Sequence, residues 1–228
     1  MNIFATKHYS NRLGRNQYAA ELIRTHFPLS EEVLNVGGSA ANHLKSLMPN
    51  RTITAVDIDP KADIEFDLDS DDQLPVKEKK PDLIVALDVL EHLEKFHERL
   101  DEILDLASDG IIVSLPISSS ETARILLRPS SYRRKGSTEA TFSKYYGLPL
   151  ERPEDRHRWY IYGSDILQLA ASLEKRGYVV HVGFDTLFKS KALSNLIITF
   201  FGRHLLPNLI SKWVWLVVTK PSLRSEKP

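Results

Sequence analysis

The chain has 228 residues, and its 42% hydrophobic and 26% charged content is ordinary for a globular protein with one sizeable core. Lysine plus arginine and aspartate plus glutamate both number 30, so the formal net charge is zero, which argues against a nucleic-acid partner. The absence of cysteine excludes disulfides and thiolate metal sites and suits a reducing cytoplasm, where we expect the protein to be. No apolar run reaches the roughly 20 uncharged residues of a membrane-spanning helix.

Helices and strands are expected to alternate along the chain. Apolar residues recur at helical spacing from Gly14 to Phe27, which predicts the first helix. Six expected strands share a largely apolar character, and they are Glu32–Val36, Thr52–Ile58, Leu83–Leu87, Ile111–Leu115, Tyr178–Val182 and Trp213–Val218. A short acidic strand is also expected at Asp63–Leu68. The later expected helices are Ala40–Met48, Leu93–Ala107 and Ser164–Arg176, with Gly177 ending the last one. This alternation predicts an α/β fold with a mostly parallel sheet.

The most informative motif joins the first two strands. Gly37 and Gly38 follow the first strand, so the backbone can turn sharply there and approach a ligand closely. Asp57 ends the second strand, where a carboxylate can accept hydrogen bonds from ribose hydroxyls. The two features together predict a nucleoside-containing cofactor at the carboxyl edge of a doubly wound sheet. Asp57 could instead cap the turn at Asp59-Pro60, because Asp before Pro favours turns.

From Glu31 to Ile117, and more loosely from Trp159 to Pro221, the chain resembles the class I S-adenosylmethionine-dependent methyltransferases. Four ordered matches carry the resemblance, and they are Val33–Gly38, Asp57, Asp67 in Phe66-Asp67-Leu68, and Pro81–Leu93. The Glu91-His92-Leu93 that closes the last match is typical of the ubiquinone-biosynthesis-like branch. The resemblance implies a Rossmann-like, doubly wound sheet of seven strands, mostly parallel with an antiparallel last strand. It also implies S-adenosyl-L-methionine as the cofactor.

The same resemblance assigns the cofactor-binding residues, which are Asn35, Gly37, Gly38, Asp57, Asp67, and the backbone around Leu87 and Asp88. Asp57 would hold the ribose, and Asp67 would face the adenine amino group. The chain departs from the family pattern in two places. Asn35 stands where the family usually has an acid, and Ser39 and Ala41 stand where it usually has glycines. These departures leave open a catalytically degenerate domain that binds a nucleoside or serves as a partner protein.

The segment after the fourth strand has two interpretations. If a helix begins near Val89, Asp88 lies close to its N-cap and Glu91 lies in its first turn, where backbone N–H groups stabilise carboxylates. We favour this interpretation and expect no metal. The alternative is a divalent-metal site formed by Asp88, Glu91 and His92, whose spacing places them on one helical face. His157 could add a fourth ligand from a loop.

Methyl transfer is mainly a task of positioning the acceptor against the methyl carbon. We expect O-methylation of a small or anionic acceptor, with His92 or His157 as the base that removes the acceptor's proton. Five cations gather between Arg124 and Lys135, and Arg156–Tyr160 continues the same character. These segments favour the recognition of an anion, although a solvated cationic loop explains them equally well.

A single methyltransferase domain is expected over residues 1–228. Its parts are an N-terminal helical cap (1–30), a substrate-side insert (116–158) and an apolar insert before the last strand (189–212). The apolar insert is expected to be core or a dimer contact. The cations that flank it also allow a peripheral membrane surface. The oligomeric state and the identity of the acceptor are not predicted.

Overall fold

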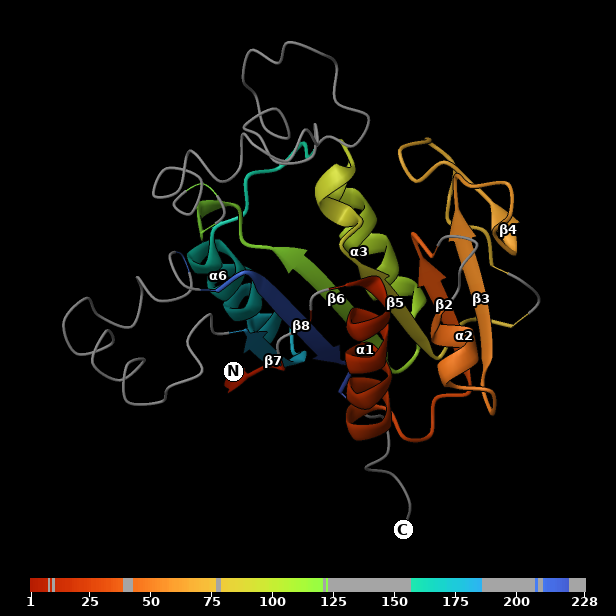
Figure 1. The fold of residues 1–228 in the computed structure, drawn as a ribbon, viewed down its shortest axis with the longest axis horizontal. Helices are drawn as coiled ribbons and strands as arrows, with labels where there is room; N and C mark the ends of the chain where they lie inside the picture. Colours follow the sequence, from red (N-terminus) through yellow and green to blue (C-terminus); the bar gives the residue numbers. More distant parts are fainter. Residues whose placement is uncertain are drawn as a thin grey trace, which may run out of the picture.

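A computed structural model describes residues 1–7, 9, 11–38, 43–76, 79–120, 122, 157–185, 208 and 211–221. Over these residues the central layer is a sheet of eight strands in the order β1-β7-β8-β6-β5-β2-β3-β4 (Figure 1). The strands are β1 Asn2–Ala5, β2 Glu32–Val36, β3 Thr52–Asp57, β4 Ile64–Glu65, β5 Leu83–Leu87, β6 Gly110–Pro116, β7 Val179–Phe184 and β8 Trp213–Thr219.

Strand direction in this sheet agrees with the expected fold class. Neighbouring strands pair in parallel, except that β8 runs antiparallel to both β6 and β7. Every residue of β5 is buried, as are all but the last residue of β6, because helices cover both faces of the sheet. The Rossmann-like fold with an antiparallel last strand is therefore confirmed.

The expected count of seven strands is one too low. Residues 2–5 form β1, which pairs in parallel with β7 at the edge of the sheet, with Ile3 beside Val182. The strand has only four residues and none is buried, so its sequence carries no alternation to reveal it. The expected N-terminal helical cap over residues 1–30 therefore begins with a strand.

Two helical layers enclose the sheet (Figure 1). Helices α1 (Arg12–His26) and α2 (His43–Leu47) pack on one face against Val33, Val85 and Trp215. On the other face lie the 3₁₀ turn η1 (Leu90–His92) and the helices α3 (Phe96–Leu106) and α6 (Gly163–Lys175). None of the helices in the described ranges is long and apolar enough to cross a bilayer. The inserts expected at 116–158 and 189–212 lie mostly outside these ranges.

Several element boundaries differ from the expected ones. β4 keeps only two residues of the strand expected over Asp63–Leu68. The helix expected over Leu93–Ala107 begins later, at Phe96, and in the turn before it the Asp69 carboxylate accepts the N–H groups of Glu94 and Lys95 (2.8 and 3.3 Å). The end of α6 is as expected, because Gly177 adopts a φ of 93° and the next N–H donates back to the Leu173 carbonyl.

The sheet order reverses between β2 and β5. The chain proceeds from β2 outward to β3 and β4, and then returns to β5 on the other side of β2. A ligand in an open α/β sheet binds outside the carboxyl ends of the strands at such a reversal. A ligand bound there would lie next to Gly37, which follows β2, and Asp88, which follows β5.

The face between α1 and the sheet can be tested through Trp215, which is fully buried. Its ring meets those of Tyr9 and Tyr18 edge-on, with centroids 5.9 and 5.0 Å away. Trp215→Ala should lower the free energy of unfolding by about 3–5 kcal/mol in urea titrations. Ile3→Ala, at a side chain 55% exposed, should change it by less than about 0.5 kcal/mol. Equal losses in the two variants would mean that this face is not a packed core.

Candidate functional site

The glycine turn lies at the centre of the carboxyl edge. Val36 is level with Val56 of β3 and with Ala86 of β5, so the ends of these three strands lie side by side. Gly37 has a φ of 69°, in the left-handed region that favours glycine, and its N–H donates to the Val56 carbonyl (2.8 Å).

Close packing within the protein also requires the two glycines. A Cβ on Gly37 would lie 2.5 Å from a methyl carbon of Val89. A Cβ on Gly38 would lie 2.3 Å from the amide nitrogen of Asn35, which is buried beneath the turn. Larger residues are therefore excluded from both positions before any ligand is considered. Ser39 and Ala41, where the family pattern departs, lie outside the described residues.

The two carboxylates expected to bind the cofactor belong to Asp57, at the end of β3, and Asp67, which follows β4. Asp57 ends β3, and its Oδ1 accepts the N–H of Asp59 (2.9 Å), so the turn-capping interaction is present. The second carboxylate oxygen has no donor among the described residues and can accept from a ligand. Ile58, which the sequence analysis missed, is 67% exposed beside it. Asp67 is exposed, and its Oδ1 accepts the N–H of Asp69 (2.9 Å).

Asp88 lies next to the N-cap of η1, as expected, but its carboxylate does not cap that turn. Val89 occupies the cap position of η1, and no side chain caps that turn. Asp88 has a φ of 51° after the buried Leu87, and its carboxylate accepts from the guanidinium of Arg15 on α1 and from the hydroxyl of Ser114 on β6. The carboxylate thus faces other elements rather than the N–H groups of its own turn.

Glu91 lies in the first turn of η1, as expected, but it is buried there. Its side chain is 1% exposed, and neither carboxylate oxygen has a hydrogen-bond partner among the described residues. Burial, and then the charge of Asp88, raise the pKa of Glu91 to about 8, while His92 acts in the opposite direction. In the absence of a cation, this carboxyl group therefore holds a proton at neutral pH.

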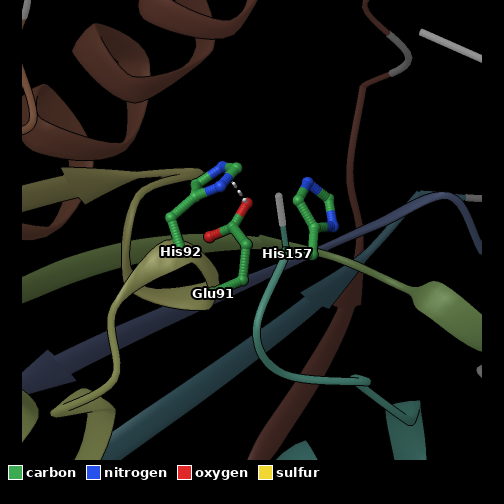
Figure 2. A group of neighbouring side chains, drawn as sticks. All are labelled: Glu91, His92 and His157. Carbon is green, nitrogen blue, oxygen red and sulfur yellow. Dashed lines mark ion pairs between the residues drawn. The ribbon is translucent and has the colours of Figure 1, made fainter. Parts of the chain in front are cut away.

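His157 joins Glu91 and His92 in one cluster. Figure 2 shows the three side chains pointing toward one another, two from η1 and one from the segment that precedes α6. Their potential ligand atoms all lie within 4.8 Å of one another, and Glu91 Oε1 is 3.7 Å from His92 Nε2. The two imidazole rings meet edge to face, with centroids 4.7 Å apart.

Backbone contacts hold the His157 segment against η1. The N–H groups of Arg158 and Trp159 both donate to the carbonyl of Glu91 (2.8 and 3.3 Å). The Trp159 indole donates to the carbonyl of Leu93 (2.6 Å), and Arg158 Nε donates to that of His92 (3.0 Å). Arg158 also forms an ion pair with Glu94, which adds to the contacts between the His157 segment and the chain after η1. The anion recognition expected of Arg156–Tyr160 stays a prediction.

The cluster suits two kinds of chemistry. A carboxyl group and two imidazoles can accept and donate protons at neutral pH. The same oxygen and nitrogen donors can coordinate a divalent cation. The donors that converge here are Glu91, His92 and His157, whereas the metal alternative weighed from the sequence used Asp88 in place of His157.

Comparison with known proteins identifies the family. A model of a family described as "Methyltransferase domain" matches residues 10–182, which is most of the chain. The chain belongs to this methyltransferase family. The family uses S-adenosylmethionine as its methyl donor. The ubiquinone-biosynthesis-like branch stays a prediction. No protein of curated function matches the sequence of this methyltransferase.

Solved structures share the fold of the methyltransferase. The plantazolicin methyltransferase BpumL in complex with SAH superposes with a TM-score of 0.59 at 14% identity, covering 92% of this chain and 83% of that one. The methyltransferase domain of bacterial-CtHen1-C gives 0.51 at 15% identity, covering 92% and 98%. A SAM-dependent methyltransferase from Archaeoglobus fulgidus gives 0.50 at 16% identity, covering 90% and 94%. At these identities the likeness is one of fold.

The buried carboxyl group of Glu91 predicts a specific pH dependence of stability. Because the pKa of Glu91 is raised from 4.5 to about 8, the folded protein keeps a proton that the unfolded chain loses within this window. The contribution of Glu91 to the free energy of unfolding therefore falls as the pH rises between these values, by at most about 1.4 kcal/mol per pH unit. Glu91→Gln should remove this decline.

Chemical denaturation of both proteins between pH 5 and pH 8, with a chelator present, measures the difference. Glu91→Gln should gain stability relative to the wild type as the pH rises. Parallel pH profiles for the two proteins would contradict a protonated, buried Glu91.

Proposed function

We propose that this methyltransferase transfers the methyl group of S-adenosylmethionine to an oxygen atom of an acceptor placed at Glu91, His92 and His157. The observation that carries the proposal is the position of this cluster. Glu91 and His92 lie in η1, which follows β5 beside the strand reversal at which a ligand of this fold binds, and His157 packs against His92. The expected acid–base residues thus adjoin the expected cofactor site.

The residues at the carboxyl edge fit the cofactor. Asp57 keeps one carboxylate oxygen for the ribose hydroxyls. Ile58 offers an exposed apolar side chain next to it, on which an adenine ring can pack. The left-handed turn at Gly37 brings bare backbone to the middle of the edge, between the ends of β3 and β5. The Asn35 side chain packs against Gly38 beneath this turn.

The proposed domain spans the whole chain. The family match ends at residue 182, but β8 lies beyond it and pairs with both β6 and β7. Removing β8 would expose the edges of two buried strands, so residues 213–219 belong to the same folding unit.

S-adenosylmethionine supplies a methyl group on a positively charged sulfur, and transfer needs an acceptor oxygen in line with it. His92 is 26% exposed and is the most accessible of the three cluster residues. In the proposed mechanism it takes the proton of the acceptor hydroxyl. The Glu91 carboxyl group lies 3.7 Å from the His92 ring nitrogen, and His157 packs edge to face against the same ring, so both neighbours hold the imidazole in place.

A divalent cation is the second candidate for activating the acceptor. The observation that favours it is Glu91, whose buried carboxylate oxygens have no hydrogen bond among the described residues. A buried carboxylate needs either a proton or a cation, and two imidazoles offer nitrogen atoms within 4.8 Å of each other and of a Glu91 oxygen. Such a cation would lower the pKa of an acceptor hydroxyl directly.

The acceptor itself is proposed to be small or anionic. The cations between Arg124 and Lys135 that motivate this proposal lie outside the described residues. The alternative of a degenerate, non-catalytic domain predicts no turnover with any acceptor, and a failure to bind the cofactor would favour it.

Calorimetric titration with S-adenosylmethionine should give a 1:1 complex in which Asp57 contributes. Asp57→Ala removes charge-assisted hydrogen bonds to the ribose and should cost roughly 2–4 kcal/mol of binding free energy. Asp59→Ala is the matched control, because Asp59 also accepts a backbone N–H of the same turn (from Lys61, 3.0 Å). Affinity that is unchanged in Asp57→Ala, or lowered equally in both variants, would place the ribose elsewhere.

Titration of the chelator-treated protein with Mn²⁺ separates the two ways of activating the acceptor. If His92 acts as a base without a cation, no stoichiometric binding is seen, and turnover survives exhaustive chelation but falls in His92→Asn. A cation site instead gives one bound Mn²⁺ per chain, which is lost in both Glu91→Gln and His157→Asn. Asp88→Asn distinguishes the two ligand sets, because only the set inferred from the sequence includes Asp88.

A further inference from the structure

The ion pair between Arg15 and Asp88 lies at the strand reversal and has no role in the function proposed above. Arg15 extends from α1 and donates through Nη1 to Asp88 Oδ2. Both side chains are only 17% exposed. The Nε–H of Arg15 is buried and has no hydrogen-bond partner among the described residues. The guanidinium therefore keeps a donor that a further anion could use.

The backbone holds the Asp88 carboxylate in this place at a conformational cost. Asp88 is the one non-glycine residue with positive φ among those described. A left-handed conformation at a non-glycine residue persists only where the surrounding structure enforces it, and it is common at functional sites. The next residue, Val89, packs directly on the Gly37 turn. The ion pair is therefore adjacent to the turn that is expected to approach the cofactor.

The charges of this pair match one end of the cofactor. The amino-acid end of S-adenosylmethionine carries an ammonium and a carboxylate, and both need partners when they leave water. Asn35, beneath the glycine turn, is neutral and supplies neither charge. Arg15 and Asp88 supply both, and a guanidinium can bind a carboxylate through two N–H groups.

The distances along the sheet edge suit the same assignment. Asp57, at the proposed ribose site, ends β3, and Asp88 follows β5, two strands away across β2. Neighbouring strands lie about 4.8 Å apart, so roughly 10 Å separates the two strand ends. A thioether chain that leaves the ribose and crosses the Gly37 turn can therefore reach Asp88 and Arg15.

We propose that Arg15 binds the carboxylate, and Asp88 the ammonium, of the amino-acid end of the cofactor. The two side chains pair with each other when no ligand is bound. This inference rests on the proposed binding of S-adenosylmethionine, and it gives the N-terminal helix α1 a part in the cofactor site.

Two nucleoside probes test the proposal by calorimetry. S-adenosylhomocysteine carries the amino-acid end, whereas 5′-methylthioadenosine shares the adenosine and the sulfur but lacks that end. Arg15→Met should weaken the binding of S-adenosylhomocysteine roughly 10- to 100-fold and change that of methylthioadenosine less than about twofold. Asp88→Asn should act in the same direction, and Arg15→Lys, which keeps the charge, should recover part of the loss.

Arg12→Met is the matched control, because Arg12 is an exposed cation on the same helix. It should leave the affinity for both probes unchanged. If Arg15→Met does not fold, Arg15→Lys and Asp88→Asn carry the same comparison, and retained methylthioadenosine binding shows that the nucleoside site is intact. Equal changes for both probes, or no change for either, would overturn this inference alone. A wild-type protein that binds neither probe would overturn the proposed function as well.

Discussion

The contact between the Gly37 turn and Val89 is the constraint on which the rest of the site depends. It joins the ends of β2 and β5 so closely that no side chain fits at residue 37. With Val89 seated on the turn, the preceding residue bends into a left-handed conformation, and the Asp88 carboxylate meets Arg15 and Ser114. The chain then enters η1, which carries Glu91 into the interior. One packing contact between two neighbouring strand ends thus fixes the positions of the site's acids.

Long-range contacts complete the site from the other end of the chain. His157 is far from Glu91 in the sequence, and two backbone N–H groups that follow it bond to the Glu91 carbonyl. The Trp159 indole reinforces this connection at Leu93. Because this connection uses main-chain groups of η1, the position of His157 depends on the 3₁₀ geometry of that turn. Melting η1 would therefore release His157 and expose Glu91 together.

The sequence predicted what its local patterns encode. Apolar runs located six of the eight strands of the central sheet because burial on both faces leaves that signature, and the glycines and Asp57 located the reversal at the carboxyl edge. The strand β1 was not predicted because an exposed edge strand has no buried face and therefore no apolar pattern. The role of Asp88 was misjudged because Arg15, its partner, lies 73 residues away. The convergence of His157 on Glu91 likewise depends on tertiary contacts that spacing along the chain does not encode.

The protonation of Glu91 bears on the energetics of the proposed reaction. Methyl transfer begins with a positively charged sulfonium and ends with a neutral thioether. An ionised carboxylate beside the sulfur would stabilise the reactant more than the transition state, and so would slow the reaction. Burial and the nearby Asp88 keep the pKa of Glu91 high, which removes that charge at neutral pH. The neutral carboxyl group keeps its proton beside His92 while that imidazole takes the proton of the acceptor. His92 can thus activate the acceptor while no ionised Glu91 carboxylate stabilises the reactant sulfonium.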